Sequence, residues 1–531
     1  MSKKIKKGLT IGFSIICVIC LVVLFFANTI VEKKLETTLK TLPESVRFNY
    51  SALHVNVFQG MLFVENPELE LLEGVRKEVN LKVKLEDFKL KNISYWEYIV
   101  NNTIQLDSIL LEDAQISYIK ESEKTKDSVD SNSSPKSAST SKQKGLKKFN
   151  KIIKIGNFDL SHATVNIFKG SKDSIFIKSE NVNISFNDIY FDAVSAEKSI
   201  PFEYSDYRVI TDSLKFNVGK FETIKLHDLD LTKKHWVVRE FKLQTRYTKQ
   251  ELTKIIDKER DHFNVQVDSI YIQQPEFGFS ENQFYFKTDT IVLQKPDLVI
   301  YRNKMVPDDY TIKPLYSKML RDLKFDLTLP VLLLRDGNIL YEEKVKTGVK
   351  PGEIIFADLN ATIKNLSNTY TLPIKTELDI NTKFMDSAPL HAVWTFDVNN
   401  ESDEFMFKAQ IGLLAVSQLN TYTENNLNLK LEGQFDEIYA RINGNVNQST
   451  IDFNVKYENM KVHVLNKKHK KNKFLSSVAN IFISNDSKKE DNDFKKEKGE
   501  VTRDKTKSIF NFLWLNFKEG LKLVFIGDGI I

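Results

Sequence analysis

The chain has almost no cysteine. Of its 531 residues only Cys17 and Cys20 are cysteines, and both lie inside an apolar N-terminal stretch. Beyond Cys20, therefore, a disulfide-stapled scaffold and a zinc site built on thiolates are both excluded. The C-x-x-C spacing of the pair is best explained by two small apolar side chains of a lipid-facing helix.

The sequence also lacks the motifs of common enzymes. It contains no G-x-S-x-G, no G-x-x-x-x-G-K-[ST], no H-E-x-x-H and no EF-hand loop. Its eight histidines are scattered, and no two of them stand four residues apart, as two metal ligands on one helix face would. The 76 basic and 71 acidic residues nearly cancel, so no nucleic-acid-binding surface is indicated. We expect no enzyme, no metal or other cofactor, and no nucleic-acid partner.

One long stretch carries no charge at all. It runs from Leu9 to Ala27, and its 19 residues give about 28 Å of helix, against a hydrocarbon core of about 30 Å. Four lysines between Lys3 and Lys7 precede it, which places residues 1–8 in the cytoplasm. A cleaved signal peptide is the alternative, but the run is long for one and lacks an A-x-A site. The sequence predicts a single transmembrane anchor at residues 9–29.

The pattern after the anchor changes at Pro43. Apolar residues between Asn28 and Leu42 are spaced as in a short helix, which the proline ends. Beyond it the period becomes two, for example at Leu81, Val83 and Leu85, as in strands that bury one face. We therefore predict a mainly β body.

A more specific signal is a pattern of apolar residues at positions i, i+2, i+5, i+7, i+12 and i+14. The pattern occurs four times, and turn-forming residues such as Asp336-Gly337 stand between i+7 and i+12 of each copy. Each copy is predicted to be a strand, a polar break and a second strand, although chance alternation in a β protein remains an alternative. The copies are Ile104, Leu106, Ile109, Leu111, Ile116 and Tyr118; Ile153, Ile155, Phe158, Leu160, Val165 and Ile167; Val265, Val267, Ile270, Ile272, Phe277 and Phe279; and Leu327, Leu329, Leu332, Leu334, Ile339 and Tyr341.

One such unit cannot cover its own apolar face, so neighbouring units must stack. The predicted fold is an elongated, curled, antiparallel-type β-sheet with few helices, comprising a first β segment at residues 30–120 and a body at 149–465. The Ser- and Lys-rich residues 121–148 are predicted to be a disordered insertion, and residues 249–263 a helical insertion.

The C-terminal part differs in composition from the body. Residues 466–507 are rich in charge and are predicted to be a linker. Residues 508–531 are strongly apolar, with Phe510, Trp514 and Phe517 among them. Both a helix that caps the end of the sheet and a helix that lies on a membrane surface fit this composition.

Several stretches resemble the AsmA/TamB-type proteins of Gram-negative envelopes. They are Trp394-Thr-Phe396, the strand pair of residues 433–445 with Gly444-Asn445, the stretch from Tyr457 to Val462, and residues 64–74, which follow the anchor. Together with the anchor and the repeated strand pairs, the resemblance covers most of the chain. It includes no catalytic signature, and this chain is shorter than the longest members of the family.

The resemblance implies an inner-membrane anchor, a body in the periplasm, and a β-sheet curled into an apolar groove through which phospholipid acyl chains could move. It implies a role in phospholipid transport or outer-membrane biogenesis. The alternative is a scaffold or assembly factor for outer-membrane proteins, in which the strands close over a dry core and an envelope protein is the partner. The groove-lining candidates are Ile104, Leu106, Ile116, Ile153, Val165, Ile167, Val265, Phe277, Phe279, Leu327 and Ile339.

Overall fold

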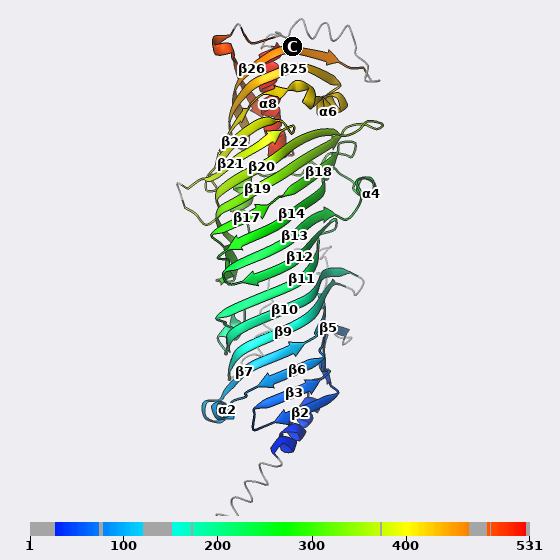
Figure 1. Cartoon of the computed structure of the whole chain (residues 1–531), viewed down its shortest axis with the longest axis vertical. Helices are drawn as coiled ribbons and strands as arrows, with labels where there is room; N and C mark the ends of the chain where they lie inside the picture. The colour runs from blue at the N-terminus through cyan, green and yellow to red at the C-terminus, as the bar shows by residue number, and fades with distance from the viewer. Residues whose placement is uncertain are drawn as a thin grey trace, which may run out of the picture. The chain divides into compact units, whose positions relative to one another are not determined.

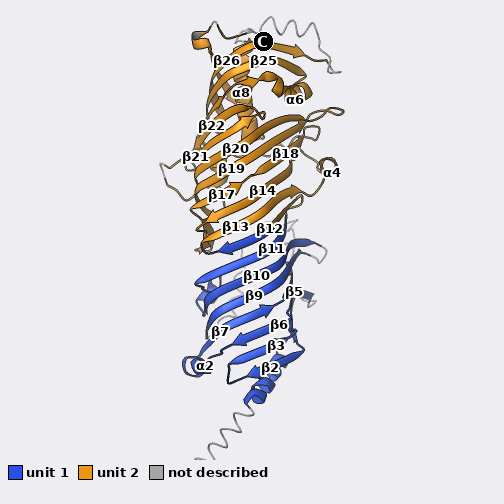
Figure 2. Cartoon of the chain, in the orientation of Figure 1, with its two compact units in different colours: residues 1–217, 227–233 blue, residues 218–226, 234–531 orange. Residues whose placement is uncertain are grey.

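The computed structural model describes residues 27–73, 78–120, 151–170, 174–371, 374–466, 486–488 and 490–526. Over these residues the protein is mainly β with few helices, as the sequence predicts (Figure 1). The chain divides into two compact units (Figure 2). Unit 1 comprises residues 1–217 and 227–233, and unit 2 comprises residues 218–226 and 234–531.

Three predicted segments lie wholly or largely outside the described residues: residues 1–8, the anchor up to residue 26, and the insertion at 121–148. The described chain begins with a helix over residues 27–40, which ends before Pro43 as expected. Among the helices that the structure describes, none combines the length and the apolar character needed to cross a membrane.

Unit 1 is built on short strands followed by long ones. Besides the helix at 27–40 it contains α2 (Tyr95–Asn101) and the 3-10 turn η1 (Ser195–Glu197). Its strands are β1 (Val46–Asn49), β2 (Ala52–Asn56), β3 (Met61–Glu65), β4 (Glu68–Glu73), β5 (Glu78–Lys84), β6 (Asp87–Lys91), β7 (Thr103–Glu112), β8 (Gln115–Lys120), β9 (Ile152–Lys169), β10 (Ile175–Phe191) and β11 (Asp206–Val218); β12 (Glu222–Thr232) contributes residues to both units.

The central strand of unit 1 is β9. On one side it pairs in parallel with β7 and then β8, and on the other it pairs antiparallel with β10, which pairs with β11. The sheet continues antiparallel from β7 through β6 and β3 to β2, and from β8 through β5 and β4 to β1. The parallel pairs correct the expectation of an antiparallel sheet. Parallel neighbours need a long connection, and residues 121–151 connect β8 to β9.

Unit 2 consists mainly of long strands. They are β13 (His235–Thr245), β14 (His262–Gln273), β15 (Glu276–Ser280), β16 (Gln283–Lys287), β17 (Thr290–Gln294), β18 (Asp297–Asn303), β19 (Asp326–Lys344), β20 (Gly352–Ser367), β21 (Thr376–Phe384), β22 (Ala388–Phe396), β23 (Phe405–Ile411), β24 (Leu414–Ala415), β25 (Leu429–Gly444), β26 (Gln448–Val464) and β27 (Lys495–Thr502). Its helices and turns are α4 (Lys249–Ile255), α5 (Tyr316–Arg321), η2 (Val416–Leu419), α6 (Asn420–Tyr422), the π-helical η3 (Thr423–Leu427), η4 (Asp491–Asp493) and α8 (Ile509–Ile526).

The sheet of unit 2 repeats the arrangement around β9. Here β19 pairs in parallel with β16, β17 and β18 on one side and antiparallel with β20 on the other. From β20 the sheet continues antiparallel through β21, β22, β23, β25 and β26 to β27, while β17 and β18 pair antiparallel with β14, which pairs with β13. In both units, then, successive short strands lie end to end beside one long strand: β7 and β8 beside β9, and β16, β17 and β18 beside β19.

Two segments differ from their predictions. Residues 495–502, predicted to belong to a linker, form β27, which pairs with β26. Its alternate residues from Lys495 to Val501 are partly buried, and Gly499 lies against Leu523 and Glu519 of α8. The predicted helix at 249–263 ends at Ile255, since Glu259 and Asp261 form ion pairs with Lys304 and Arg302 instead.

Two apolar clusters mark where the units are most tightly packed. In unit 1 a small cluster is formed by Ala114, Leu160, Ala163 and Val182. In unit 2 a much larger one lies between α8, which contacts β26 and β27, and the strands from β22 onward. Ile442, Phe453 and Val455 in it are 0% exposed. The strands that carry the four copies of the repeat thus contribute no residue to the largest core.

Candidate functional site

The first two copies of the repeat stack on each other position by position. Strands β7 and β8 carry the first copy and β9 carries the second, and their parallel register matches Ile104 with Ile153, Ile116 with Val165, and every other position with its counterpart. Residues directly opposite in neighbouring strands project from the same face of a sheet. The six groove candidates of unit 1 therefore share one face.

The other two copies do not touch each other. The third, on β14 and β15, is separated from the fourth, on β19, by the strands β16 to β18. Apolar residues nevertheless continue across these intervening strands. Val265 lies opposite Leu298, which lies opposite Ile339, and Phe277 lies opposite Phe286, which lies opposite Leu327. The candidates of unit 2 thus belong to one apolar face as well, which we call the inner face of each unit.

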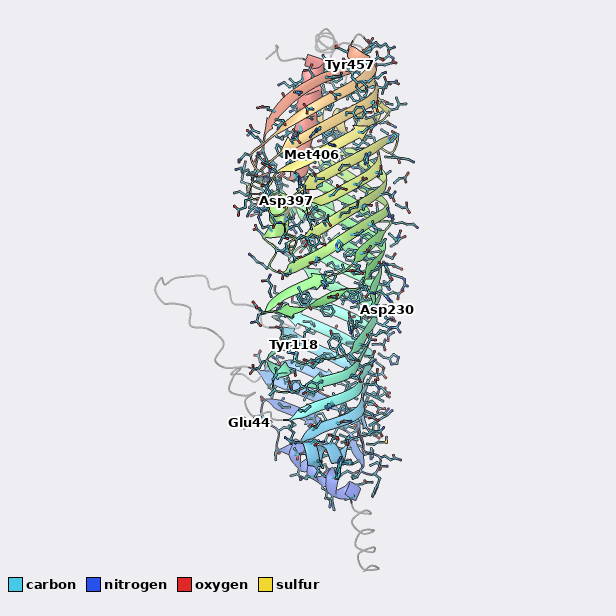
Figure 3. The ribbon with its side chains drawn as sticks, turned by 90° about the vertical axis from the view of Figure 1, so that its left-hand side faces the viewer. Glu44, Tyr118, Asp230, Asp397, Met406 and Tyr457 are labelled. Carbon is cyan, nitrogen blue, oxygen red and sulfur yellow. The ribbon has the colours of Figure 1, made fainter. Side chains whose placement is uncertain are left out.

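Two spacings in the repeat break the period of two: the three residues from i+2 to i+5 and the five from i+7 to i+12. Irregularities of the strands explain both. At i+9 each copy has a residue with left-handed backbone: Asp113, His162, Gln274 and Asp336, with φ from 47° to 53°. At i+3 the ladder is interrupted, as at Asp107 and Gly156, where a side chain on Gly156 would come within 2.8 Å of the Asp107 carbonyl oxygen. Each irregularity adds a residue that returns the next apolar side chain to the same face and bends the strand. The strands of each unit are accordingly arched (Figure 3).

The inner face is apolar, and most of its candidate side chains are only partly buried. Leu106 is 6% exposed and Phe279 is 48% exposed, while the other nine candidates are half-buried. Rings of neighbouring strands line it: the Trp236 ring centroid lies 5.5 Å from that of Phe277 and 5.6 Å from that of Phe286. The sequence could have identified Trp236, because Trp236, Val238, Phe241 and Leu243 on β13 repeat the i, i+2, i+5, i+7 spacing.

A loop partly covers the inner face of unit 1. Residues 192–204 bring Phe202 and Tyr204 to ring-centroid distances of 5.5 and 5.3 Å from Phe186 on β10. The loop is held by Ser195, whose hydroxyl donates to the Asp192 carbonyl oxygen at 3.1 Å, and by the ion pair of Lys198 with Glu203 at 2.6 Å. Ser195 and Lys198 therefore hold the conformation of the loop.

Helix α8 closes the inner face at β25 to β27. Phe517 of α8 packs at 6.1 Å from Phe453 on β26, and Phe525 packs at 5.0 Å from Tyr457. Gly520 lets the helix approach, since a side chain there would lie 2.5 Å from the Phe453 ring. Of the two readings of residues 508–531, the structure places residues 509–526 on the sheet as a cap. The inner face is therefore a dry core at this end of unit 2 and open farther along β14 and β19.

A polar cluster stands where the open part of unit 2 meets the closed part. Glu343 on β19 accepts hydrogen bonds from the hydroxyls of Tyr341 and Tyr422, at 2.8 and 3.1 Å, and from the Asn426 amide at 3.3 Å. Burial first, and then the charge of Glu343, raise the pKa of both tyrosine hydroxyls. These polar groups anchor α6 and η3 to β19 and were not identified from the sequence.

An ion pair lies beside this cluster. Arg302 on β18 donates through two nitrogens to Asp261, each at 2.6 Å. Burial lowers the pKa of Arg302, but the hydrogen bonds and charge of Asp261 outweigh it and raise the pKa above its ordinary value. Both charges are compensated, so neither is poised for acid or base chemistry.

The described residues contain no group of three or more His, Cys, Asp or Glu side chains that could hold a metal ion. A hollow of about 590 Å³ lies on the other face of the sheet in unit 2, lined by polar residues of β22 to β27 such as His391, Lys408 and Arg441. This hollow is shallow and lined by several charged residues, whereas the inner face carries the large apolar side chains of the repeat.

Comparison with known proteins identifies no family for this chain. No protein-family model matches the sequence, and no curated protein matches it significantly. The geometry of the inner face is therefore the basis for a functional conclusion.

Proposed function

We propose that this chain is an inner-membrane protein, anchored through residues 9–29, whose inner face binds the acyl chains of phospholipids in the periplasm. Its role would be phospholipid transport or outer-membrane biogenesis, in the manner of the AsmA/TamB-type proteins that its sequence resembles. The observation that carries the proposal is the apolar inner face, which runs across neighbouring strands while most of its candidate side chains are only partly buried.

An apolar face that stays in contact with water is unfavourable in free energy, and a bound acyl chain would relieve this cost. Each methylene group that passes from water to an apolar surface gains about 0.8 kcal/mol. In unit 1, the strands β2, β3, β6, β7, β9, β10 and β11 are successive neighbours, and at about 4.8 Å per strand they extend over about 29 Å. One lipid tail needs about 15 Å, half of a bilayer core. The bends at i+3 and i+9 would curl the sheet into a groove that holds tails while head groups remain in water.

A second candidate, a scaffold or assembly factor for envelope proteins, is favoured by the closed end of unit 2. There α8 and β22 to β27 enclose a closely packed apolar core. The outermost strand of that end, β27, carries Lys495, Lys496, Glu497 and Lys498. Charges of this kind discourage pairing with another strand, which weakens the case for assembly through the sheet edge.

The experiment that separates the two is photo-crosslinking in intact cells. A photoreactive amino acid is placed at Phe277, on the inner face, and at Glu276, which is exposed and pairs with Lys287 at 2.8 Å. Both variants are checked for folding and membrane attachment. A phospholipid adduct at position 277 and none at 276 is the expected result. Equal adducts, or none at either position, would overturn lipid binding and favour the scaffold.

A further inference from the structure

Helix α2 in unit 1 has no buried side chain. Trp96 is 71% exposed, Ile99 77% and Val100 54%, and Tyr95 and Tyr98 are also exposed. The helix is nevertheless well formed at its ends, because Ser94 caps its first turn and Asn102 closes the last in left-handed backbone. A short, capped helix that presents so much apolar surface indicates a contact with something outside the unit.

The helix lies beside the point where the described chain begins. Asn28 and Glu32, in the helix at 27–40, accept hydrogen bonds from the backbone N–H groups of Val57 at 2.8 Å and Val55 at 3.0 Å. The turn after Val57 ends at Gly60, whose carbonyl oxygen accepts from the N–H of Ile93, next to the α2 cap, at 2.9 Å. Figure 1 shows the helix at 27–40 and α2 at the same end of unit 1.

Two more apolar side chains extend the exposed surface of α2. Phe58, in that turn, is 62% exposed, and Ile30, in the helix at 27–40, is 59% exposed. Lys151 places its ammonium group 3.9 Å from the centroid of the Tyr98 ring. The hydrogen bond and charge of Lys151, with a smaller contribution from Lys34, lower the pKa of Tyr98, so both lysines lie near this surface.

The composition of this surface identifies its partner. Tryptophan and tyrosine concentrate at the boundary between lipid and water, where the ring is buried and the polar atom stays wet. Lysines around such rings face the lipid phosphates. The apolar run of residues 9–27 stands immediately before the helix at 27–40 in the sequence.

We propose that α2, together with Phe58 and Ile30, is a membrane-docking surface that inserts Trp96 and Ile99 into the interfacial layer of the phospholipid bilayer entered by residues 9–27. The inference rests on the membrane attachment in the proposed function, but not on lipid transport. It seats that end of unit 1 directly on the bilayer, so that the inner face begins where acyl chains are available.

The test uses the full-length chain reconstituted in vesicles of phosphatidylethanolamine and phosphatidylglycerol, with or without bromine-labelled phosphatidylcholine as a quencher of tryptophan emission. Wild type is compared with Trp96→Phe, a change at an exposed site. As a matched control, Tyr310→Trp in the Trp96→Phe background places a tryptophan in unit 2 at a site that is 76% exposed.

Flotation with the vesicles reports the anchor separately. The expected result is flotation of all three proteins, with the Trp96 contribution to emission quenched by about twofold or more and no added quenching from position 310. Flotation without quenching of Trp96 would overturn docking and leave the anchor intact. A blue-shifted but unquenched Trp96 would mean that a protein, such as a second copy, covers α2 instead. Failure to float would overturn both the docking surface and the proposed anchor.

Discussion

Asp113, between β7 and β8, and His162, in the neighbouring strand β9, both stand at position i+9 of the repeat. Both have left-handed backbone, with φ of 52° and 53°. The N–H of Asp113 donates to the Ser161 carbonyl oxygen at 3.0 Å, so the two bends lie in register. Lys295 and Asp336 repeat the relationship in unit 2, where the N–H of Lys295 donates to the Arg335 carbonyl oxygen at 2.8 Å. Both units therefore bend their strands in the same way.

The bend at His162 can be tested through the backbone. His162→Val should lower the free energy of unfolding by about 1–2 kcal/mol, because a β-branched residue is strained at positive φ, whereas His162→Gly should not lower it. The side chain itself is largely exposed, so its loss matters little. Urea unfolding of the full-length chain measures the difference. Thr164→Val, two residues along the same strand, is the control. Equal effects of valine and glycine at position 162 would contradict the strain argument.

The contrast between closed core and open face predicts unequal costs of losing a phenylalanine ring. Phe453→Ala, at a side chain that is 0% exposed, should cost about 3–5 kcal/mol of unfolding free energy. Phe279→Ala, at a ring that is 48% exposed, should cost less than about 1 kcal/mol, because much of that ring already faces water. Chemical denaturation of both variants decides the matter. Similar losses would mean that the inner face at Phe279 is covered.

The close approach of α8 to the sheet depends on Gly520. Gly520→Ala should destabilise the closed end of unit 2, even though alanine favours a helix by about 1 kcal/mol, because the added methyl group would meet the Phe453 ring. Lys518→Ala, on the exposed side of the same helix, should leave stability unchanged within about 0.5 kcal/mol. Thermal unfolding followed by tryptophan emission compares them. A more stable Gly520→Ala variant would show that α8 is not held at this distance.

The loop after β18 should be sensitive to acid. Hydrogen bonds from Lys313, then Lys258 and Thr311, hold the pKa of Asp309 below its ordinary value of 3.8. Because the folded pKa is the lower one, the contribution of Asp309 to stability is present at neutral pH and is lost as the pH falls through the folded value. The difference in unfolding midpoint between wild type and Asp309→Asn should stay constant above about pH 5 and shrink as the pH falls below about 4. A difference that stays constant below about pH 4 as well would rule out the ion pairs as its source. Asp257→Asn, at an exposed residue nearby, serves as the control.

The period-two pattern predicted the mainly β fold, and the repeat identified side chains such as Ile104 and Ile153, which lie side by side on one face of the sheet. Both successes have a local cause, since alternation along a strand is a property of neighbouring residues. The steps of three and five were visible too, but their meaning was not. That they preserve one face depends on bends such as those at Asp107 and His162, which become apparent only when a second strand lies beside the first.

The sequence could not have revealed several other features. The charged residues of β27 predicted a linker, because the burial of β27 comes from packing against other elements, α8 and β26, and not from its own composition. The hydrogen bonds of Glu343 come from Tyr422 and Asn426, about 80 residues away along the chain. Contacts over such separations leave no local pattern.

The sequence by itself determined which side chains are apolar and at what spacing they recur, and hence that each strand has one apolar face. The tertiary structure alone decided where that face is closed and where it is open. Phe453 and Phe277 both belong to alternating strands, yet α8 packs over the first and leaves the second only partly buried. The reason is physical: burial depends on which distant segment covers a face, whereas alternation depends only on the geometry of the strand that presents it.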